Sequence, residues 1–289
     1  RWRSDIRTGS LKEMTPYSLR LIATDMITAI YNNIAQLFIG KIYSTHSLGF
    51  YSQAQKLKDL PVTSTVQAVQ GVTYPALSKL GADDMKFSEG YLKILRLLSF
   101  VVFPLMLGFV AIAPEMFELL LGDKWMPTVP YFEILALSGL FYPLSIVSYN
   151  ILKVKSDGRI ILRLEIIKRV VMTIVLAVTI PQNIEAVAWG MTAMAAIDFI
   201  INLVAAMRYI NIGVWTILRT LMPQFMVALV MFVVLHVANT YLLDLSCGLH
   251  LVLDIAIGVI SYAALALVFR LRAFTESLAL LRGVLSKSA

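Results

Sequence analysis

The sequence has few charged residues and a single cysteine. Of its 289 residues, 15% are charged and 58% are hydrophobic, whereas a soluble domain is typically about a quarter charged and about half apolar. This composition favours an integral membrane protein. The lone cysteine, Cys247, excludes an internal disulfide and a zinc site built from cysteines.

Motifs of several protein classes are also absent. The sequence has no Walker-type phosphate loop, no dinucleotide-binding glycine motif and no nucleophile beside a base, so we predict neither an enzyme nor a cofactor. A basic stripe interleaved with aromatic residues is missing as well, so no nucleic-acid partner is predicted. Because the sequence opens at Arg1 without an initiator methionine or an apolar signal sequence, we expect it to be the C-terminal portion of a longer protein.

Eight apolar stretches follow one another, each long enough for one membrane crossing. About 20 helical residues span the roughly 30 Å of hydrocarbon in a bilayer. The pattern therefore predicts an all-α integral membrane protein with eight transmembrane helices, followed by a short amphipathic helix on the membrane surface. The predicted spans are residues 21–40, 60–78, 97–121, 134–152, 166–184, 186–207, 220–243 and 249–269.

The basic residues are distributed unevenly between alternate connections. On one side the connections hold Lys41, Lys56, Lys58 and Lys124, which are 4 of the 25 lysines and arginines. All the others, including Lys168 and Arg169, are assigned to the opposite side. Because lysine and arginine concentrate in cytoplasmic loops, we expect a multi-pass protein with both termini in the cytoplasm.

The first two predicted spans are too polar to face lipid on all sides. Unpaired polar groups in lipid are costly, so such helices usually turn them toward a water-filled cavity or another helix. We interpret the two spans as walls of a polar pathway with Lys56 near its mouth. The first carries Asp25, Asn32, Asn33 and Gln36, and the second carries Thr63, Ser64, Thr65, Gln67, Gln70 and Thr73.

Two lysines and several amides of this region are candidates for substrate binding. Lys56 and Lys58 would attract an anion strongly inside a low-dielectric cavity. The alternative is that they are interface lysines whose stems lie in lipid and whose ammonium groups reach the headgroups. The candidate amides can bind sugar hydroxyls or tie two helices together. They are Asn32, Asn33 and Gln36 on the first span and Gln67 and Gln70 on the second.

Two carboxylates are candidates for ion coupling. Asp198 lies near the middle of a predicted span, where an ionisable residue is often functional; alternatively, its partner is Asn202 one turn later. Asp25 lies near the cytoplasmic end of the first predicted span, where it can bind an ion or pair with Arg20.

One face of the last predicted span carries three residues with metal-binding side chains. Cys247, His250 and Asp254 follow helical spacing, which would bring them together. No fourth ligand is evident in the sequence. The sequence therefore favours a structural role and predicts no metal site.

Several short motifs occur in a fixed order. They are Asn32-Asn33-Ile34, Ile39-Gly40-Lys41, Leu48-Gly49-Phe50-Tyr51-Ser52, Lys56-Leu57, Leu60-Pro61, Tyr74-Pro75-Ala76-Leu77-Ser78, Leu121-Gly122-Asp123-Lys124-Trp125 and Gly158-Arg159. Together they resemble the polysaccharide flippases of the Wzx type, especially the colanic-acid and lipopolysaccharide branch. This family belongs to the multidrug/oligosaccharidyl-lipid/polysaccharide exporter superfamily.

The resemblance implies two six-helix lobes around a central cavity, often with two added C-terminal helices. Residues 1–208 would be the second lobe of this MATE-like transporter, and residues 209–289 would be the added helices and a cytoplasmic tail. The missing N-terminal lobe would be a partner. The resemblance also implies that Lys56 meets the pyrophosphate of the substrate. Many relatives carry an acidic residue where this sequence has Ala35 and Gln36, so no ion-coupling role is carried over to that position.

We therefore predict a flippase of the bacterial inner membrane. Its substrate would be an undecaprenyl-pyrophosphate-linked oligosaccharide for lipopolysaccharide or exopolysaccharide biosynthesis, moved among membrane lipids by alternating access. The alternative is a multidrug cation antiporter of the same superfamily, with Asp198 at the centre. A polysaccharide polymerase or ligase is less favoured, because the predicted external loops are short and carry no catalytic groups.

Overall fold

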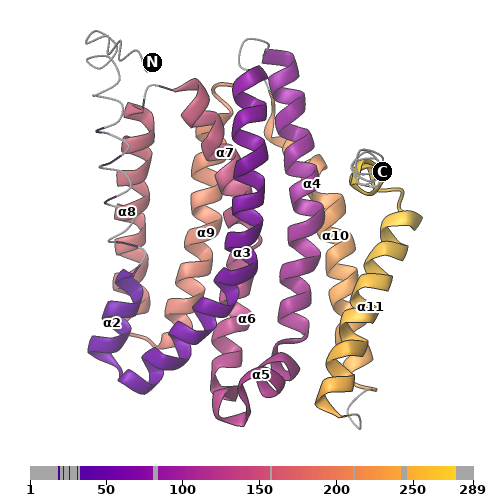
Figure 1. Cartoon of the computed structure of the whole chain (residues 1–289). Helices are drawn as coiled ribbons and strands as arrows, with labels where there is room; N and C mark the ends of the chain where they lie inside the picture. The colour runs from indigo at the N-terminus through magenta and orange to yellow at the C-terminus, as the bar shows by residue number, and fades with distance from the viewer. Residues whose placement is uncertain are drawn as a thin grey trace, which may run out of the picture.

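The protein is an all-α membrane protein whose helices stand side by side (Figure 1). The computed structural model describes residues 19, 22, 26, 31, 33–80, 84–156, 158–210, 212–241 and 246–277, with the backbone alone at residues 68–70, 72–80 and 84. The predicted fold class, all-α and membrane-embedded, is confirmed.

The helices follow one another in an alternating course. The short α2 (Ile34–Ile42) leads into the long α3 (Thr45–Leu80), and α4 (Asp84–Ala111) runs back beside it. At the end of α4 come α5 (Ala113–Leu121) and the short 3-10 helix η1 (Asp123–Thr128). The chain continues through α6 (Val129–Ser138), α7 (Tyr142–Lys155), α8 (Arg159–Thr179), α9 (Ile184–Ala206), α10 (Val214–Asn239) and α11 (Cys247–Val268).

Helix α3 is continuous where the sequence predicts a connection followed by a span. Residues 49–61, expected to join two spans, lie inside this helix of 36 residues. Pro61 also lies inside it, and a proline within a helix removes a hydrogen bond and bends the axis. Figure 1 shows α3 running obliquely at its start and upright beyond, a change of direction that we attribute to Pro61.

Hydroxyl groups that follow the proline bond back to the helix itself. Thr63 and Ser64 donate to the carbonyl oxygens of Asp59 and Leu60, at 2.6 and 2.9 Å. Thr65 does the same to Pro61, at 2.8 Å. These hydroxyls are therefore paired within α3 itself. Thr63 also lines the cavity described below, so the interpretation of this segment as a wall of a polar pathway stays a prediction.

Two predicted spans are each divided by a turn. The predicted span 97–121 consists of the end of α4 and the separate helix α5, which has Pro114 in its first turn. The predicted span 134–152 consists of α6 and α7, and Pro143 lies in the first turn of α7. Proline is well tolerated in a first turn, where its missing N–H would have no helical partner. These prolines therefore start new helices.

Two glycines of the short sequence motifs shape helix ends. Gly122, after α5, has φ 81° and its N–H bonds to the carbonyl oxygens of Phe117 and Glu118. Gly158 has φ 75° and directly precedes α8. Only glycine adopts such positive φ values without steric cost. The glycines of these two motifs are therefore suited to the backbone conformation at the helix ends.

Five described segments are long and apolar enough to cross a membrane. They are residues 85–111, 123–155, 184–206, 214–239 and 247–268. The last three agree closely with predicted spans. Helices α3 and α8 lie alongside these segments (Figure 1) but carry more polar and charged residues.

The outer surface of the bundle is rich in exposed aliphatic side chains. On α8 these include Ile166, Val170, Ile174 and Val178, and on α10 and α11 they include Val233, Val237, Val259 and Ile260. Soluble proteins rarely expose so extensive an apolar surface. The surface is instead suited to lipid, as expected of a multi-pass membrane protein.

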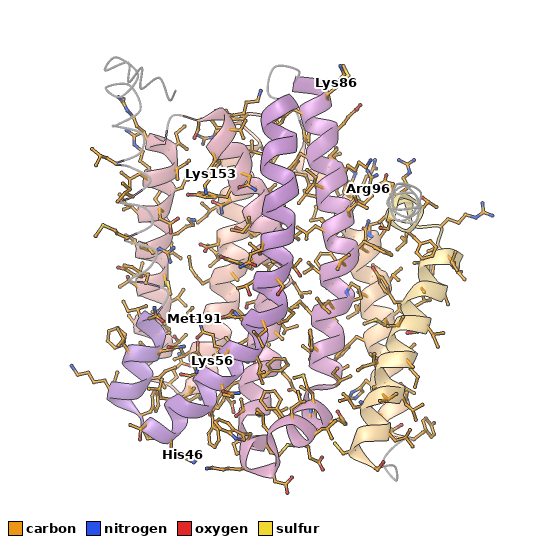
Figure 2. The ribbon with its side chains drawn as sticks, in the orientation of Figure 1. His46, Lys56, Lys86, Arg96, Lys153 and Met191 are labelled. Atoms are coloured by element: carbon orange, nitrogen blue, oxygen red, sulfur yellow. The ribbon has the colours of Figure 1, made fainter. Side chains whose placement is uncertain are left out.

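Basic residues distinguish the two ends of the bundle. Figure 2 shows Lys86, Arg96 and Lys153 toward one end and His46 at the other. Lys86 lies at the start of α4 and Lys153 at the end of α7. The two connections that hold them, which the sequence assigns to one side of the membrane, therefore lie at the same end of the bundle.

Candidate functional site

A cavity of about 580 Å³ lies between α3, α6, α7, α8 and α9. Its lining includes both apolar residues, such as Met191 (Figure 2), and a concentration of charged ones. The charged lining residues are Lys58 and Asp59 from α3, Glu165, Lys168 and Arg169 from α8, and Asp198 from α9. Because charges are rare inside apolar bundles, this cavity is the candidate functional site.

Helix α8 supplies a carboxylate held between two cations. Lys168 Nζ lies 2.6 Å from Glu165 Oε2, and an Arg169 Nη2 atom pairs with Glu165 Oε1. The three residues share one face because they are spaced by three and four positions. Glu165 and Lys168 are both buried, and buried charges are stable only when paired in this way. The cluster retains one formal positive charge.

Aromatic rings flank the two cations of α8. The Arg169 guanidinium carbon lies 5.6 Å from the ring centroid of Tyr31, and Lys168 Nζ lies 5.7 Å from that of Tyr149. Cations at such distances are attracted to the negative face of an aromatic ring. The rings therefore help to fix Lys168 and Arg169 at the cavity.

Lys168 and Arg169 were counted with the basic residues of a connection, although the predicted span 166–184 includes both at its start. Helix α8 begins at Arg159, so both residues lie roughly 14 Å along the helix from its start. The predicted span began too late because the charged first half of α8 is not apolar. The spacing of Glu165, Lys168 and Arg169 was a usable signal, since a carboxylate followed by cations at three and four positions is typical of a helix.

The two candidate lysines of α3 have different surroundings. Lys58 lines the cavity, and its Nζ lies 2.6 Å from Asp59 Oδ1. The Lys58 side chain is only 15% exposed. Lys56 is exposed, and the described lining of the cavity does not include it. The substrate-binding role that the family resemblance implies for Lys56 stays a prediction.

The candidate amides are divided between the cavity and a contact of two helices. Asn33 lines the cavity. Gln36 donates its amide to Gln55 Oε1 at 3.0 Å, which ties α2 to α3, and Gln55 lines the cavity. Gln67 is exposed and is not among the described lining residues. The side chains of Asp25, Asn32 and Gln70 lie outside the described part of the chain.

Asp198 faces the cavity with an oxygen that has no hydrogen bond. Its Oδ1 is buried and lacks a partner among the described residues. Asn202, suggested above as the partner of Asp198, instead donates its amide to Ser145 Oγ at 2.8 Å. The side chain of Asp198 is therefore able to accept a hydrogen bond from a proton donor or to contact a cation within the cavity.

Fold and cavity together define a multi-pass membrane protein with an internal charged site. The structure is similar to that of the lipid II flippase MurJ in an inward closed conformation, with a TM-score of 0.63 and 15% sequence identity. The match covers 93% of this chain and 56% of the MurJ chain. At this level of identity the similarity shows a MurJ-like fold.

Sequence comparison shows similarity to polysaccharide biosynthesis proteins. Residues 1–130 match the family described as "Polysaccharide biosynthesis protein". The teichuronic acid biosynthesis protein TuaB of Bacillus subtilis (strain 168) is 23% identical over 281 residues, 96% of this chain and 57% of TuaB. The predicted resemblance to the polysaccharide biosynthesis and export proteins is confirmed by these matches.

Two further relatives match over shorter regions. The lipopolysaccharide biosynthesis protein WzxC of Escherichia coli (strain K12) is 25% identical over 120 residues, 42% of this chain and 24% of WzxC. The succinoglycan biosynthesis transport protein ExoT of Rhizobium meliloti (strain 1021) is 23% identical over 133 residues, 46% of this chain and 27% of ExoT. The chain thus spans 57% of the length of TuaB and about a quarter of the lengths of WzxC and ExoT.

Proposed function

We propose that this chain forms part of a flippase that moves a lipid-linked oligosaccharide across the bacterial inner membrane by alternating access. The observation that carries the proposal is the convergence of three cations, Lys58, Lys168 and Arg169, from two helices on a cavity whose lining also holds three carboxylates. A lipid-linked sugar diphosphate requires concentrated positive charge to leave water. Arginine contributes a planar pair of donors for phosphate oxygens, and lysine contributes a compact charge.

The sugar and the coupling ion would use other parts of the same cavity. The amides of Asn33 and Gln55 are suited to hydrogen bonds with sugar hydroxyls. Asp198, with its unpaired oxygen, would bind the coupling ion or proton. Similarity to a polysaccharide biosynthesis family and the MurJ-like fold support this assignment.

The proposal includes an arrangement of eight spans. Helices α3 and α8 would cross the membrane with their polar faces toward the cavity, in addition to the five apolar segments. A helix before α2 would complete the set. Residues 1–208 would form the second lobe of a two-lobe transporter, residues 209–289 would add two helices and a tail, and both termini would be cytoplasmic. Two lobes that rock around a central site are a general design for transporters.

Arg169→Gln tests the proposed function directly. In cells that depend on this protein, we expect surface polysaccharide to fall at least about tenfold, because a hydrogen bond to a charged group is worth about 1.5–3 kcal/mol. Glu165 keeps Lys168 as a partner in this variant, so the helix should still fold. Surface polysaccharide and the amount of protein in the membrane are both measured.

The matched control is Arg163→Gln. Arg163 lies on the same helix, is exposed and is not among the described lining residues. We expect this variant to retain normal polysaccharide. If Arg169→Gln also exported polysaccharide normally at normal protein levels, the assignment of this cavity to the diphosphate would be wrong.

The unpaired oxygen of Asp198 also favours a second candidate, a multidrug cation antiporter. A cavity that binds organic cations needs a carboxylate free of other partners, as this oxygen is. Under this alternative, Asp198→Asn would abolish efflux of an organic cation while Arg169→Gln would preserve it. Drug accumulation in the two variants distinguishes the candidates.

A further inference from the structure

A second group of ionisable residues lies at the opposite side of the bundle from α8, where α5 meets α11. Glu115 comes from α5, and His250 and Asp254 come from one face of α11. Each offers one ligand atom, and these three atoms all lie within 4.8 Å of one another. The cluster shares no residue with the lining of the charged cavity.

Several polar atoms of these three residues are buried without a hydrogen-bond partner. His250 and Asp254 are only 7% and 0% exposed. Each of the three residues has one buried atom without a hydrogen-bond partner, namely Glu115 Oε2, His250 Nε2 and Asp254 Oδ2. Polar atoms buried without partners are destabilising. The cluster therefore lacks a group or ion that would contact these three atoms.

The three side chains do not satisfy one another by hydrogen bonds. His250 Nε2 lies 3.5 Å from Asp254 Oδ2, and His250 Nδ1 lies 3.8 Å from Glu115 Oε1. Both distances exceed the roughly 2.7–3.2 Å of an N–H···O hydrogen bond. The three side chains therefore form no hydrogen bond of normal length with one another.

A metal ion accounts for the spacing of His250 Nε2 and Asp254 Oδ2, and Glu115 offers an oxygen within 4.8 Å of both residues' ligand atoms. Two ligands bound to one tetrahedral ion at about 2.0–2.1 Å lie about 3.4 Å apart, close to the 3.5 Å between His250 Nε2 and Asp254 Oδ2. The combination of an imidazole nitrogen with carboxylate oxygens suits Zn²⁺ and related ions, whereas Mg²⁺ and Ca²⁺ prefer oxygen ligands alone.

A neighbouring amide fixes the orientation of Asp254. The side-chain amide group of Asn239 lies 2.7 Å from Asp254 Oδ1 and 3.0 Å from the carbonyl oxygen of Leu235. Both are acceptors, so the amide nitrogen is the atom that faces them. With Oδ1 held in this way, Oδ2 is directed to His250. Metal-binding carboxylates and histidines are commonly oriented by such outer hydrogen bonds.

The geometry points to a binding site for one divalent transition-metal ion of the Zn²⁺ type, held by Glu115, His250 and Asp254. The ion joins α11 to α5. His250 and Asp254 are the fourth and eighth residues of α11, so the site lies within about 11 Å of the start of the helix and ions reach it from that aqueous side. Cys247 is not a ligand, because its thiol lies 3.4 Å from the carbonyl oxygen of Glu115 and donates to it.

The site is tested with purified protein in detergent. We expect wild-type protein incubated with Zn²⁺ and then dialysed to retain about one Zn²⁺ per chain by elemental analysis. Calorimetric Zn²⁺ titration of His250→Gln should show an affinity lower by at least about 100-fold, since losing an outer hydrogen bond alone costs about 10–100-fold. Asn239→Leu should lower the Zn²⁺ affinity by this smaller factor of about 10–100. A residue that acts only in packing would not change the affinity.

The matched control is His236→Gln, which removes an exposed imidazole from α10. It should bind Zn²⁺ as the wild type does. The proposal is overturned if His250→Gln and the wild type bind Zn²⁺ alike, or if the wild type binds none.

Co²⁺ provides a test that needs no variant. Bound to the wild type at a site with nitrogen and oxygen ligands of low coordination number, it should give visible absorption bands that Zn²⁺ abolishes. Bands that are absent, or that Zn²⁺ does not displace, contradict the site even if His250→Gln fails to fold. This inference is independent of the proposed transport function, so either can fail while the other holds.

Discussion

At the scale of single residues, Lys56 and Lys58 provide the sharpest comparison. They are two positions apart, yet only Lys58 lines the cavity. Lys58→Gln is expected to lower surface polysaccharide at least about tenfold through loss of a charge-assisted contact, and Lys56→Gln is expected to retain most of it. Both amounts are measured in cells with equal levels of membrane-inserted protein.

The same experiment decides between geometry and family resemblance. Asp59, the partner of Lys58, is 42% exposed, so water can solvate it in Lys58→Gln and the fold should be preserved. A deeper loss in Lys56→Gln than in Lys58→Gln would favour the role implied by the resemblance and contradict the one inferred from the cavity.

The candidate site was predictable in part. Asp198 and Lys58 were identified because an ionisable residue in or beside an apolar stretch is conspicuous in a sequence. Lys168 and Arg169 were counted with a connection although they fall at the start of the predicted span 166–184, because charged residues at the edge of an apolar stretch are equally consistent with a helix end. The approach of Glu115 to His250 was not predictable, since it depends on the packing of helices distant in sequence.

At the scale of helices, Gly158 limits where α8 can begin. Its φ of 75° is unfavourable for any residue with a Cβ atom, and Gly158→Ala should therefore destabilise the protein by about 1–2 kcal/mol. Denaturant unfolding in detergent, followed by circular dichroism, measures the loss.

Gly213→Ala is the control for this prediction. Gly213 also precedes a helix, but its φ is −80°, and a Cβ added there meets no atom within 4 Å. The free energy of unfolding should change by less than about 0.5 kcal/mol. Equal losses in the two variants would show that the backbone conformation at Gly158 is not the cause.

Helix boundaries were predicted well only where apolar runs end abruptly. Helices α9, α10 and α11 match their predicted spans because each is apolar along nearly its whole length. The turn between α6 and α7 interrupts an apolar run without a change in composition, so hydropathy could not locate it. The continuity of α3 through Pro61 was missed for the opposite reason, because proline and charged residues there resemble a loop.

At the scale of the whole molecule, the two ends of the bundle should face different compartments. His46 and Lys86 lie at opposite ends (Figure 2). In a Cys247→Ser background, His46→Cys should react with a membrane-impermeant maleimide in intact spheroplasts, and Lys86→Cys should react only after lysis, because basic ends face the cytoplasm.

Both positions are exposed, so differences in labelling report compartment rather than burial. Labelling of Lys86→Cys in intact spheroplasts would reverse the proposed orientation. Labelling of both positions there would exclude a helix α3 that crosses the membrane.

The charges that line the cavity have a consequence for energetics. The six charged lining residues that the structure describes comprise three cations and three carboxylates, so their formal charges cancel. Under the proposed function, these six residues would add no net charge to the reorientation of the empty carrier, whereas a bound diphosphate would work against or with the field by about 2.3 kcal/mol per charge for each 100 mV. The part of the cavity that this chain builds would then leave the voltage dependence of transport to the substrate and to the ion bound at Asp198.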